Sequence, residues 1–256
     1  MKPVIFEILG IEIYGYGLMI ALGIVVALGI LFKLSRNNGY DEDKVFNMAL
    51  ISIVLGVLGG KLLFIITEFK SITNNPSILK DFGAGFVIYG AIMGGAVGVY
   101  AYCRKQKWNV LRVLDIVVPG VAIAQGFGRI GCLFAGCCYG APTTLPWGIT
   151  FHESPFAVNE VSLHPTQIYS SVFDFALGIF LLWSLKKYKK PGKTFSLYVI
   201  VYSIGRFLVE FLRNDPRGNV GILSTSQFIA IFTLILGIVV FNIDKLKGRR
   251  VTNEEK

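Results

Sequence analysis

The residues best suited to chemistry lie in one short stretch, "GRIGCLFAGCCYG" at 128–140, inside an otherwise oily sequence. It holds one arginine, Arg129, and three cysteines, Cys132, Cys137 and Cys138. A guanidinium offers planar, bidentate donors that suit phosphate. Clustered thiols suit soft metals or redox exchange. The stretch therefore predicts either a site for an anionic lipid built on Arg129, or a metal or redox site built on the cysteines.

The cysteines have three interpretations. Together with His152 and His164 they match zinc-site spacing only loosely, and adjacent cysteines on a helix rarely face one metal. A disulfide is compatible with an oxidising outer face. We expect the simplest interpretation, in which small, mildly apolar side chains pack near glycines and the protein holds no metal and no cofactor.

Arg129 has no acidic partner close in sequence. The nearest is Asp115, about four helical turns away. The guanidinium must therefore pair with an acid on another helix, snorkel to the interface or face a ligand. The flanking glycines leave bare backbone that a large molecule can approach, and these are Gly126, Gly128, Gly131 and Gly136. The most abundant phosphate embedded in a membrane is a phospholipid headgroup, so we expect a lipid ligand here.

A second group of charges lies within another apolar run. Glu210 follows Arg206 by four residues, and Arg213 follows Glu210 by three, so a continuous helix would place all three on one face. They form either an ion-pair ladder within the helix or, with Arg129, part of a phosphate clamp.

The elements that must position these residues are membrane helices. The 256-residue chain is 54% hydrophobic, with a mean hydropathy of +0.62. Apolar runs long enough to cross a bilayer recur along it, and their unbroken apolar character predicts helices rather than barrel strands. We predict seven spans, at 14–33, 45–66, 86–103, 114–135, 167–185, 194–212 and 222–243.

The positive charges predict the orientation. The odd-numbered loops and the tail carry 17 lysines and arginines, whereas the opposite side carries five. Cytoplasmic loops are enriched in these residues, which places the N-terminus outside and the C-terminus inside. The net charge of +9 is thus explained by topology, with some attraction to anionic membrane lipids, and no nucleic-acid partner is expected.

The whole chain, 1–256, is predicted to be one transmembrane domain of the all-α class. Residues 136–166 form a long outer segment between the fourth and fifth helices, and 244–256 form a basic cytoplasmic tail. Trp147, Phe151 and Phe156 suggest that the outer segment is an ordered cap anchored at the membrane interface. His152 is expected on the surface of that segment.

Several ordered motifs resemble one family, the bacterial phosphatidylglycerol–prolipoprotein diacylglyceryl transferases. The similar segments are "PVIFEILGIEIYGYGLM", "GRIGCLFAGCCYGAPT" with "LPWGI", "HPTQIY" and "GRFLVEFLRND". The resemblance implies seven transmembrane helices in a bacterial plasma membrane. It also implies transfer of the diacylglyceryl group of phosphatidylglycerol to the lipobox cysteine of a prolipoprotein, with release of glycerol 1-phosphate.

The resemblance also implies functional positions. Arg129 and Arg206 match the two essential arginines of the family, and we expect them to clamp the lipid phosphate. His164 and Tyr89 are candidates for proton transfer or hydrogen bonding in the reaction. The remaining motif positions, which we expect to bind substrate, are Tyr16, Gly131, Gly140, Gln167, Tyr169, Glu210 and Arg213.

Four positions depart from the family pattern. Tyr89 stands where the family usually has a histidine, Cys132 replaces an asparagine, Cys137 replaces a glutamate and Ser170 replaces an acid. Tyrosine, with an ordinary pKa near 10, is a poor base at neutral pH. The general base is therefore not identified by the resemblance.

The departures keep other functions open. One is a related membrane enzyme that moves a phospholipid-derived group to another acceptor. Another is a membrane thiol oxidoreductase that uses Cys132, Cys137 and Cys138. A transporter is disfavoured because the sequence has no convincing internal repeat.

Overall fold

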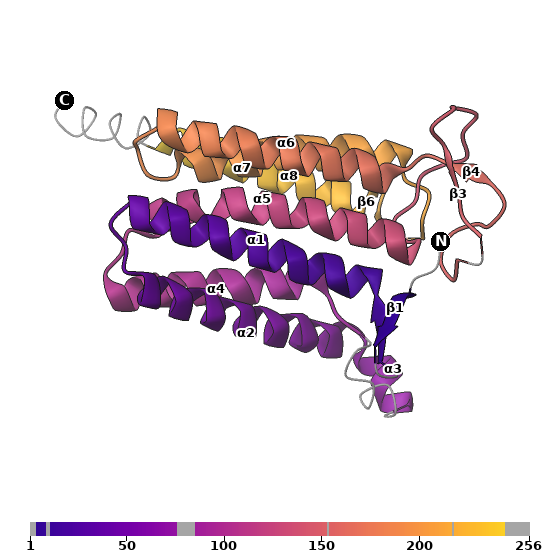
Figure 1. Cartoon of the computed structure of the whole chain (residues 1–256), viewed down its shortest axis with the longest axis horizontal. Helices are drawn as coiled ribbons and strands as arrows, with labels where there is room; N and C mark the ends of the chain where they lie inside the picture. Colours follow the sequence, from indigo (N-terminus) through magenta and orange to yellow (C-terminus); the bar gives the residue numbers. More distant parts are fainter. Residues whose placement is uncertain (1–3, 9–10, 76–84, 153, 217, 244–256) are drawn as a thin grey trace. The chain divides into compact units, whose positions relative to one another are not determined.

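The computed structural model describes residues 4–8, 11–75, 85–152, 154–216 and 218–243. Long helices dominate this part of the chain, and each overlaps one predicted apolar run (Figure 1). They are α1 (Gly15–Asn37), α2 (Glu42–Thr67), α4 (Ile88–Gln106), α5 (Val110–Ala135), α6 (Thr166–Lys187), α7 (Lys193–Val209) and α8 (Thr225–Phe241).

Shorter elements connect these helices. They are the helix α3 (Phe69–Asn74), the 3-10 turn η2 (Glu210–Leu212) and the antiparallel strand pairs β1 (Val4–Ile8) with β2 (Ile11–Tyr14), β3 (Ile149–Thr150) with β4 (Ser162–Leu163), and β5 (Asn219–Val220) with β6 (Leu223–Ser224). The strands are an addition to the predicted all-α architecture, and they lie outside the long helices.

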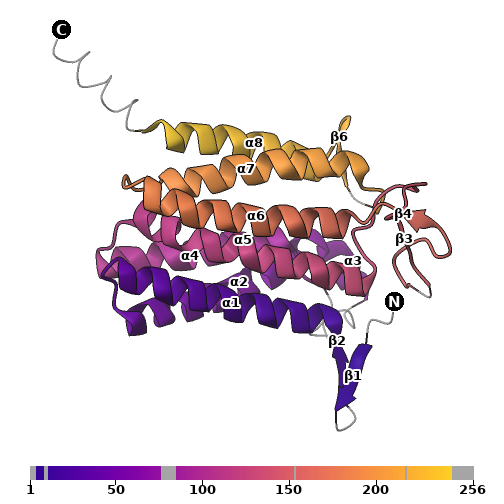
Figure 2. The same ribbon diagram turned by 45° about the horizontal axis from the view of Figure 1, so that its top comes forward.

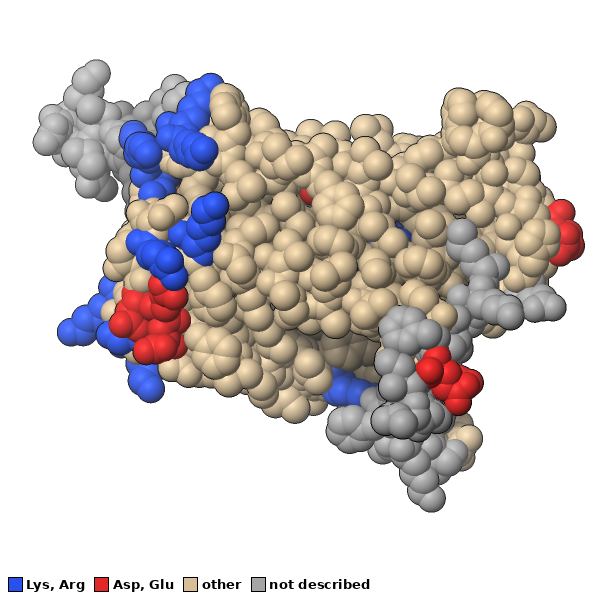
Figure 3. Space-filling model, in the orientation of Figure 1, with Lys and Arg blue, Asp and Glu red and all other residues tan. Residues whose placement is uncertain are grey.

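Within the described residues, five helical segments are long and apolar enough to cross a membrane. They are α1, α2, α5, α6 and α7 extended through η2, while α8 is apolar but only 17 residues long. Many large apolar side chains on these helices are exposed, as expected where lipid rather than protein covers them. On the face shown in Figure 3, the surface between the helix ends is almost entirely uncharged, and most of the lysines and arginines gather at one end of the helices. The protein is therefore helical and membrane-spanning.

The chain forms two compact units, one of Met1–Leu31 with Leu114–Lys256 and the other of Phe32–Val113. In the view of Figure 2 the helices of the first unit appear in the order α1, α5, α6, α7 and α8, and α7 packs against both α6 and α8. Its core joins Val118 and Ala122 of α5 to Leu177 and Leu181 of α6, and aromatic side chains of α7 pack against them.

Close helix contacts in the first unit depend on small residues. Gly126 of α5 faces the ring of Phe175 on α6, so that an added Cβ would lie 2.7 Å from the ring.

Asp115, buried in α5, accepts hydrogen bonds from the backbone N–H groups of Gly192 and Phe195 at 2.7 and 2.8 Å. It thereby satisfies the first turn of α7.

The second unit is organised around the contact between α2 and α4. Gly56 and Gly59 of α2 face Gly90 and Gly94 of α4, and the Gly94 Cα atom would lie 3.2 Å from a Cβ on Gly59. These four glycines thus bring the two backbones together, as small residues do between membrane helices.

Residues 136–166 have a small core of their own, in which Tyr139, Phe151, Ala157 and Leu163 are buried together. The prediction that Phe151 anchors at the interface is wrong, because its side chain fills this core and is 1% exposed. Trp147 is exposed, as an interfacial side chain would be. The predicted tail, 244–256, lies outside the described residues.

Candidate functional site

Arg129 lies on α5, half-buried, and forms no hydrogen bond or ion pair with any described residue. It interacts electrostatically with Asp174 of α6 and Tyr202 of α7, but neither contact is a direct ion pair. Asp174 also interacts electrostatically with Arg206, so this one buried acidic side chain interacts with both guanidiniums. Arg129 is thus partly balanced in charge while its donors stay available to a ligand.

Arg206 is held by its neighbours. Its Nη1 atom lies 2.7 Å from the Glu210 Oε2 atom, and its Nη2 atom donates a 2.7 Å hydrogen bond to Ser226 of α8. The Glu210 side chain is 1% exposed. The ion pair between Arg206 and Glu210, one of the two arrangements that the sequence left open, is therefore present, and it fixes the Arg206 guanidinium between α7 and α8.

Arg213 does not extend the helical ladder. The α-helix ends at Val209 and Arg213 has an extended backbone, so its guanidinium reaches Glu210 only at 4.0 Å. It instead donates two hydrogen bonds, of 2.8 and 2.6 Å, to Asp215. Burial alone would lower the pKa of Arg213, but the hydrogen bonds with Asp215 raise it above its usual value.

Three thiols gather beside Arg129. The Sγ atoms of Cys132, Cys137 and Cys138 all lie within 4.8 Å of one another, and the cysteines are reduced. Their mutual hydrogen bonds, with that to Cys132 the strongest influence, lower the pKa of the Cys138 thiol and raise the pKa of the Cys137 thiol. Hereafter these residues are the thiol cluster.

The start of α6 holds the turn that carries the cluster. Gln167 Nε2 donates a 2.7 Å hydrogen bond to the carbonyl oxygen of Cys137, and Thr166 Oγ1 donates one of 2.6 Å to that of Cys138. Gly140 lies against the His164 backbone and side chain, where any larger residue would collide. The predicted sites Gln167 and Gly140 therefore support the turn.

Tyr16 and Gly131 also belong to this region. A Cβ on Gly131 would lie 3.2 Å from the Tyr16 ring, so the glycine lets α1 approach α5. Tyr16 interacts electrostatically with the thiol cluster and with Arg129. Because its side chain is 45% exposed, the phenol is accessible beside the two candidate chemical groups.

His164 and Tyr169 form a separate polar group. The His164 Nδ1 atom lies 3.4 Å from the Tyr169 hydroxyl oxygen, which accepts a 2.8 Å hydrogen bond from Trp147 Nε1. In the described part of the chain, no hydrogen bond or ion pair joins His164 to Arg129 or Arg206. Tyr89 lies on α4 in the second unit, so its relation to Arg129 stays a prediction.

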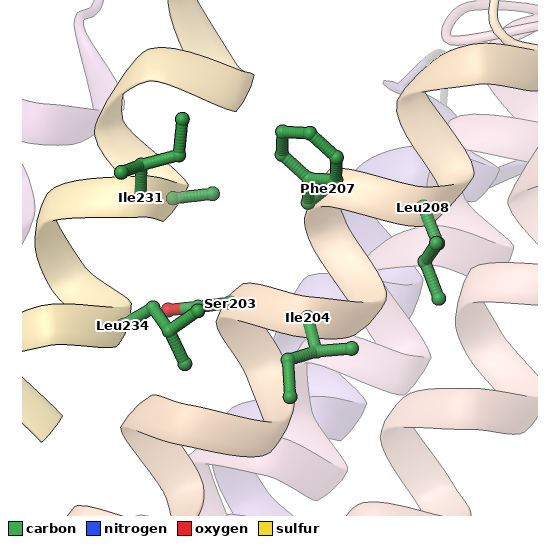
Figure 4. Close-up of a pocket in the computed structure, with 7 residues that line it drawn as sticks. Ser203, Ile204, Phe207, Leu208, Ile231 and Leu234 are labelled. Atoms are coloured by element: carbon green, nitrogen blue, oxygen red, sulfur yellow. The ribbon is translucent and has the colours of Figure 1, made fainter. Parts of the chain in front are cut away.

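An apolar pocket of about 100 Å³ lies between α7 and α8 (Figure 4). Its lining residues are Ser203, Ile204, Phe207, Leu208, Ala230, Ile231 and Leu234. The Ser203 hydroxyl is turned to Thr233 at 2.8 Å. The pocket therefore offers a hydrocarbon lining on the same two helices that hold Arg206 and Ser226.

Sequence comparison places these features in a family. The sequence profile described as prolipoprotein diacylglyceryl transferase matches residues 3–243. The chain belongs to the prolipoprotein diacylglyceryl transferase family. A Clostridium tetani protein named phosphatidylglycerol–prolipoprotein diacylglyceryl transferase is 64% identical over 247 residues, covering 96% of this chain and 99% of the relative.

Other relatives span the chain equally well. A Clostridium perfringens protein named phosphatidylglycerol–prolipoprotein diacylglyceryl transferase 2 is 59% identical over 256 residues, covering both chains fully. A Clostridioides difficile protein named phosphatidylglycerol–prolipoprotein diacylglyceryl transferase is 34% identical, and this match also covers both chains fully. Membership of the diacylglyceryl transferase family therefore applies to the entire membrane domain.

Sequence reasoning did not assign several supporting residues. Ser226 accepts a hydrogen bond from Arg206, and Asp215 accepts hydrogen bonds from Arg213. Thr166 donates a hydrogen bond to the turn that carries the thiol cluster. Asp174 was recognisable as an acid within an apolar run, but its position near two arginines depends on how α5, α6 and α7 pack. Thr166 adjoins Gln167 in the motif "HPTQIY". That motif is the feature of the local sequence that points to this segment.

Proposed function

We propose that this protein transfers the sn-1,2-diacylglyceryl group of phosphatidylglycerol to the lipobox cysteine thiol of prolipoproteins and releases glycerol 1-phosphate. It acts in the bacterial cytoplasmic membrane, with seven spans, the N-terminus outside, and residues 136–166 as an outer cap. The observation that carries the proposal is Arg129, a guanidinium inside an apolar helix that has no bound partner within the described chain.

An unpaired intramembrane arginine is costly, at about 2.5–3.5 kcal/mol on insertion scales, unless something compensates its charge. Asp174 compensates part of it from a distance. A phosphodiester completes the compensation, and its two free oxygens match the planar donor pair of Arg129. An anionic phospholipid is the ligand that reaches such a position from within the membrane.

The two arginines divide the work on the phosphate. Arg129 supplies the available fork, while Arg206 is fixed by Glu210 and Ser226 and contributes a preorganised positive field. As the carbon–oxygen bond of the glycerol breaks, negative charge builds on the leaving phosphate. Groups already oriented toward that charge lower the barrier without reorganising.

The hydrocarbon part of the lipid needs an apolar surface close to the arginines. The pocket between α7 and α8 lies next to Arg206 along α7, and its lining suits a segment of one acyl chain. Tyr16, accessible beside Arg129, is a candidate contact for the headgroup or the incoming peptide. Tyr169 and His164 are candidate contacts at the outer end of α6.

The proposal is tested with purified protein in vesicles of phosphatidylglycerol and a synthetic lipobox peptide. Glycerol phosphate release and peptide mass are followed together. We expect stoichiometric release and a diacylglyceryl adduct on the peptide cysteine, none with a cysteine-to-serine peptide, and none with Arg129→Ala. Transfer at the normal rate by Arg129→Ala would overturn the assignment of the clamp, and a different peptide product would overturn the reaction.

A further inference from the structure

The thiol cluster is an arrangement that the diacylglyceryl transfer described above leaves unused. Among the described residues it is the one group of three or more histidine, cysteine or acidic side chains spaced to hold a metal ion. Cys132, Cys137 and Cys138 are reduced, half-buried and within 4.8 Å of one another at sulfur. Three such thiols are a suitable ligand set for zinc, which prefers thiolate sulfur and tetrahedral geometry.

The objection that adjacent cysteines on a helix face different ways does not hold here. The helix α5 ends at Ala135, and Gly136 turns the chain with a φ of 71°. Cys138 has a φ of 61°, a left-handed conformation that is uncommon for a residue with a side chain. This turn brings the Cys137 and Cys138 thiols back over Cys132, and strained backbone of this kind is concentrated at functional sites.

The sulfur separations are close to those of a zinc site. Thiolates about 2.3 Å from a tetrahedral zinc lie about 3.8 Å from one another, so each sulfur–sulfur distance has to shorten by no more than about 1 Å for the cluster to close around an ion. The backbone that must hold still is anchored by Gln167 and Thr166 of α6, which bind the Cys137 and Cys138 carbonyl oxygens. Such supporting hydrogen bonds orient metal ligands.

The surrounding charge favours an anionic metal complex. Zinc with three thiolates carries one net negative charge. Arg129 and Arg213 both interact electrostatically with Cys138, and Arg129 also with Cys132. Arg129, which compensates the lipid phosphate, thus also compensates the charge of the thiolates, together with Arg213.

We propose that Cys132, Cys137 and Cys138 bind one zinc ion whose open fourth position takes the thiolate of the substrate cysteine. This inference rests on the proposed function, and it supplies the activation of the thiol that the arginines alone do not. Catalytic zinc sites have three protein ligands and one open position, and a thiol that coordinates zinc loses its proton.

The transfer step then balances. The peptide thiol releases its proton to water as the sulfur binds zinc. That sulfur attacks the glycerol carbon bearing the phosphate, a carbon–sulfur bond forms, and the carbon–oxygen bond breaks with its electron pair passing to the phosphate. Glycerol 1-phosphate leaves, and the neutral thioether, a weaker ligand than a thiolate, dissociates from zinc. Nothing is oxidised or reduced.

The position of Arg129 suits this step. It precedes Cys132 by three residues on α5, so the two side chains share a helix face. A phosphate bound to Arg129 therefore lies beside the metal position. The nucleophile and leaving group are brought together by one turn of one helix.

The experiment uses the full-length protein in detergent, reduced and stripped of metal, with Co²⁺ as a spectroscopic substitute for zinc. We expect one Co²⁺ per chain, with the visible bands of tetrahedral coordination and a thiolate charge-transfer band. A lipobox peptide should raise that band by about one third, from three thiolates to four. A peptide with serine in place of cysteine should leave it unchanged.

Variants locate the metal. Cys132→Ser, Cys137→Ser and Cys138→Ser should each weaken or abolish the cobalt bands, whereas Cys103→Ser should retain them because Cys103, a buried residue of α4, is not one of the three clustered thiols. Chromatographic behaviour and melting temperature report whether each variant is folded. Retention of the wild-type cobalt spectrum in Cys137→Ser, or no thiolate band in the wild-type protein, would overturn the proposal.

Parallel assays separate this inference from the proposed function. Full transfer by protein that elemental analysis shows to be free of metal would overturn the zinc site and leave the transferase function standing. A peptide-dependent cobalt spectrum without glycerol phosphate release by the zinc-loaded protein would support the metal site and contradict the proposed function. A cobalt thiolate band that stays unchanged when the lipobox peptide is added would overturn the assignment of the peptide thiolate as the fourth ligand.

Discussion

The Arg206 guanidinium lies 2.7 Å from the buried Glu210 carboxylate one helical turn away, whereas Arg129 contacts no described carboxylate directly. The two arginines therefore have different surroundings, although the sequence presents both as intramembrane cations. Arg206 is a fixed charge whose geometry its neighbours set. The N–H donors of the Arg129 guanidinium, in contrast, are not used by any described side chain.

Arg129→Lys should lose transfer almost as completely as Arg129→Ala. A lysine keeps the positive charge but presents a compact ammonium in place of two parallel donors. We expect a loss of at least about 100-fold in kcat, the usual effect of removing one preorganised donor, measured as glycerol phosphate release. The control is Arg36→Lys, because Arg36 forms an exposed ion pair with Glu42. Activity of Arg129→Lys within threefold of that of the unmodified protein would contradict the phosphate clamp.

Glu210→Gln should destabilise the protein. The substitution keeps the size of the side chain but leaves the Arg206 charge without its partner in a site where Glu210 is 1% exposed. Breaking a buried pair costs about 3–5 kcal/mol. The melting temperature in detergent measures it.

The control for this loss is Glu42→Gln. It breaks an ion pair of the same type between Arg36 and Glu42, with a 2.6 Å distance but exposed side chains. Exposed pairs contribute about 0–1 kcal/mol, so its melting temperature should barely change. Equal shifts in the two variants would show that burial of Glu210 is not the cause.

Gln167→Met should loosen the turn that carries the thiol cluster. The methionine fills the same volume but cannot donate the 2.7 Å hydrogen bond to the Cys137 carbonyl oxygen. We expect cobalt affinity and transfer to fall about 10-fold, at the lower end of what lost supporting hydrogen bonds cost metal sites. Gln106→Met, at the end of α4, is the control, and unchanged cobalt affinity in Gln167→Met would remove the anchoring role.

Gly94→Ala should destabilise the contact between α2 and α4. A Cβ at Gly94 would collide with the Leu55 carbonyl oxygen and lie 3.3 Å from the Gly56 Cα atom, both of which are backbone. Overpacking of this kind costs about 1–3 kcal/mol. Gly29→Ala on α1 meets nothing within 4 Å and should be neutral or gain up to about 1 kcal/mol, so thermal unfolding of the pair isolates the effect of the contact.

Tyr89→Phe tests the candidate at the position where the family usually has a histidine. If the hydroxyl donates to the phosphate, its removal should lower transfer about 10-fold, as expected for a hydrogen bond to a charged group. Tyr100→Phe on the same helix is the control, since its side chain is exposed. Full activity in Tyr89→Phe removes Tyr89 from the reaction.

The amino-acid sequence determined the helices, because an apolar run in a membrane has only one way to satisfy its backbone. Each predicted run overlaps a helix, and five of the described helical segments are long and apolar enough to cross a membrane. The pairing of Arg206 with Glu210 agrees with their spacing of four.

Only the tertiary structure decided which groups meet across helices and where helices stop. The end of α5 at Ala135 turned two adjacent cysteines toward Cys132, a convergence that helical spacing argued against. Asp174 came near Arg129 through the packing of α5 against α6, and Phe151 became buried in the small core that residues 136–166 form among themselves. Local spacing fixes neighbours within one helix, but contacts between helices depend on how side chains of both fill the space between them.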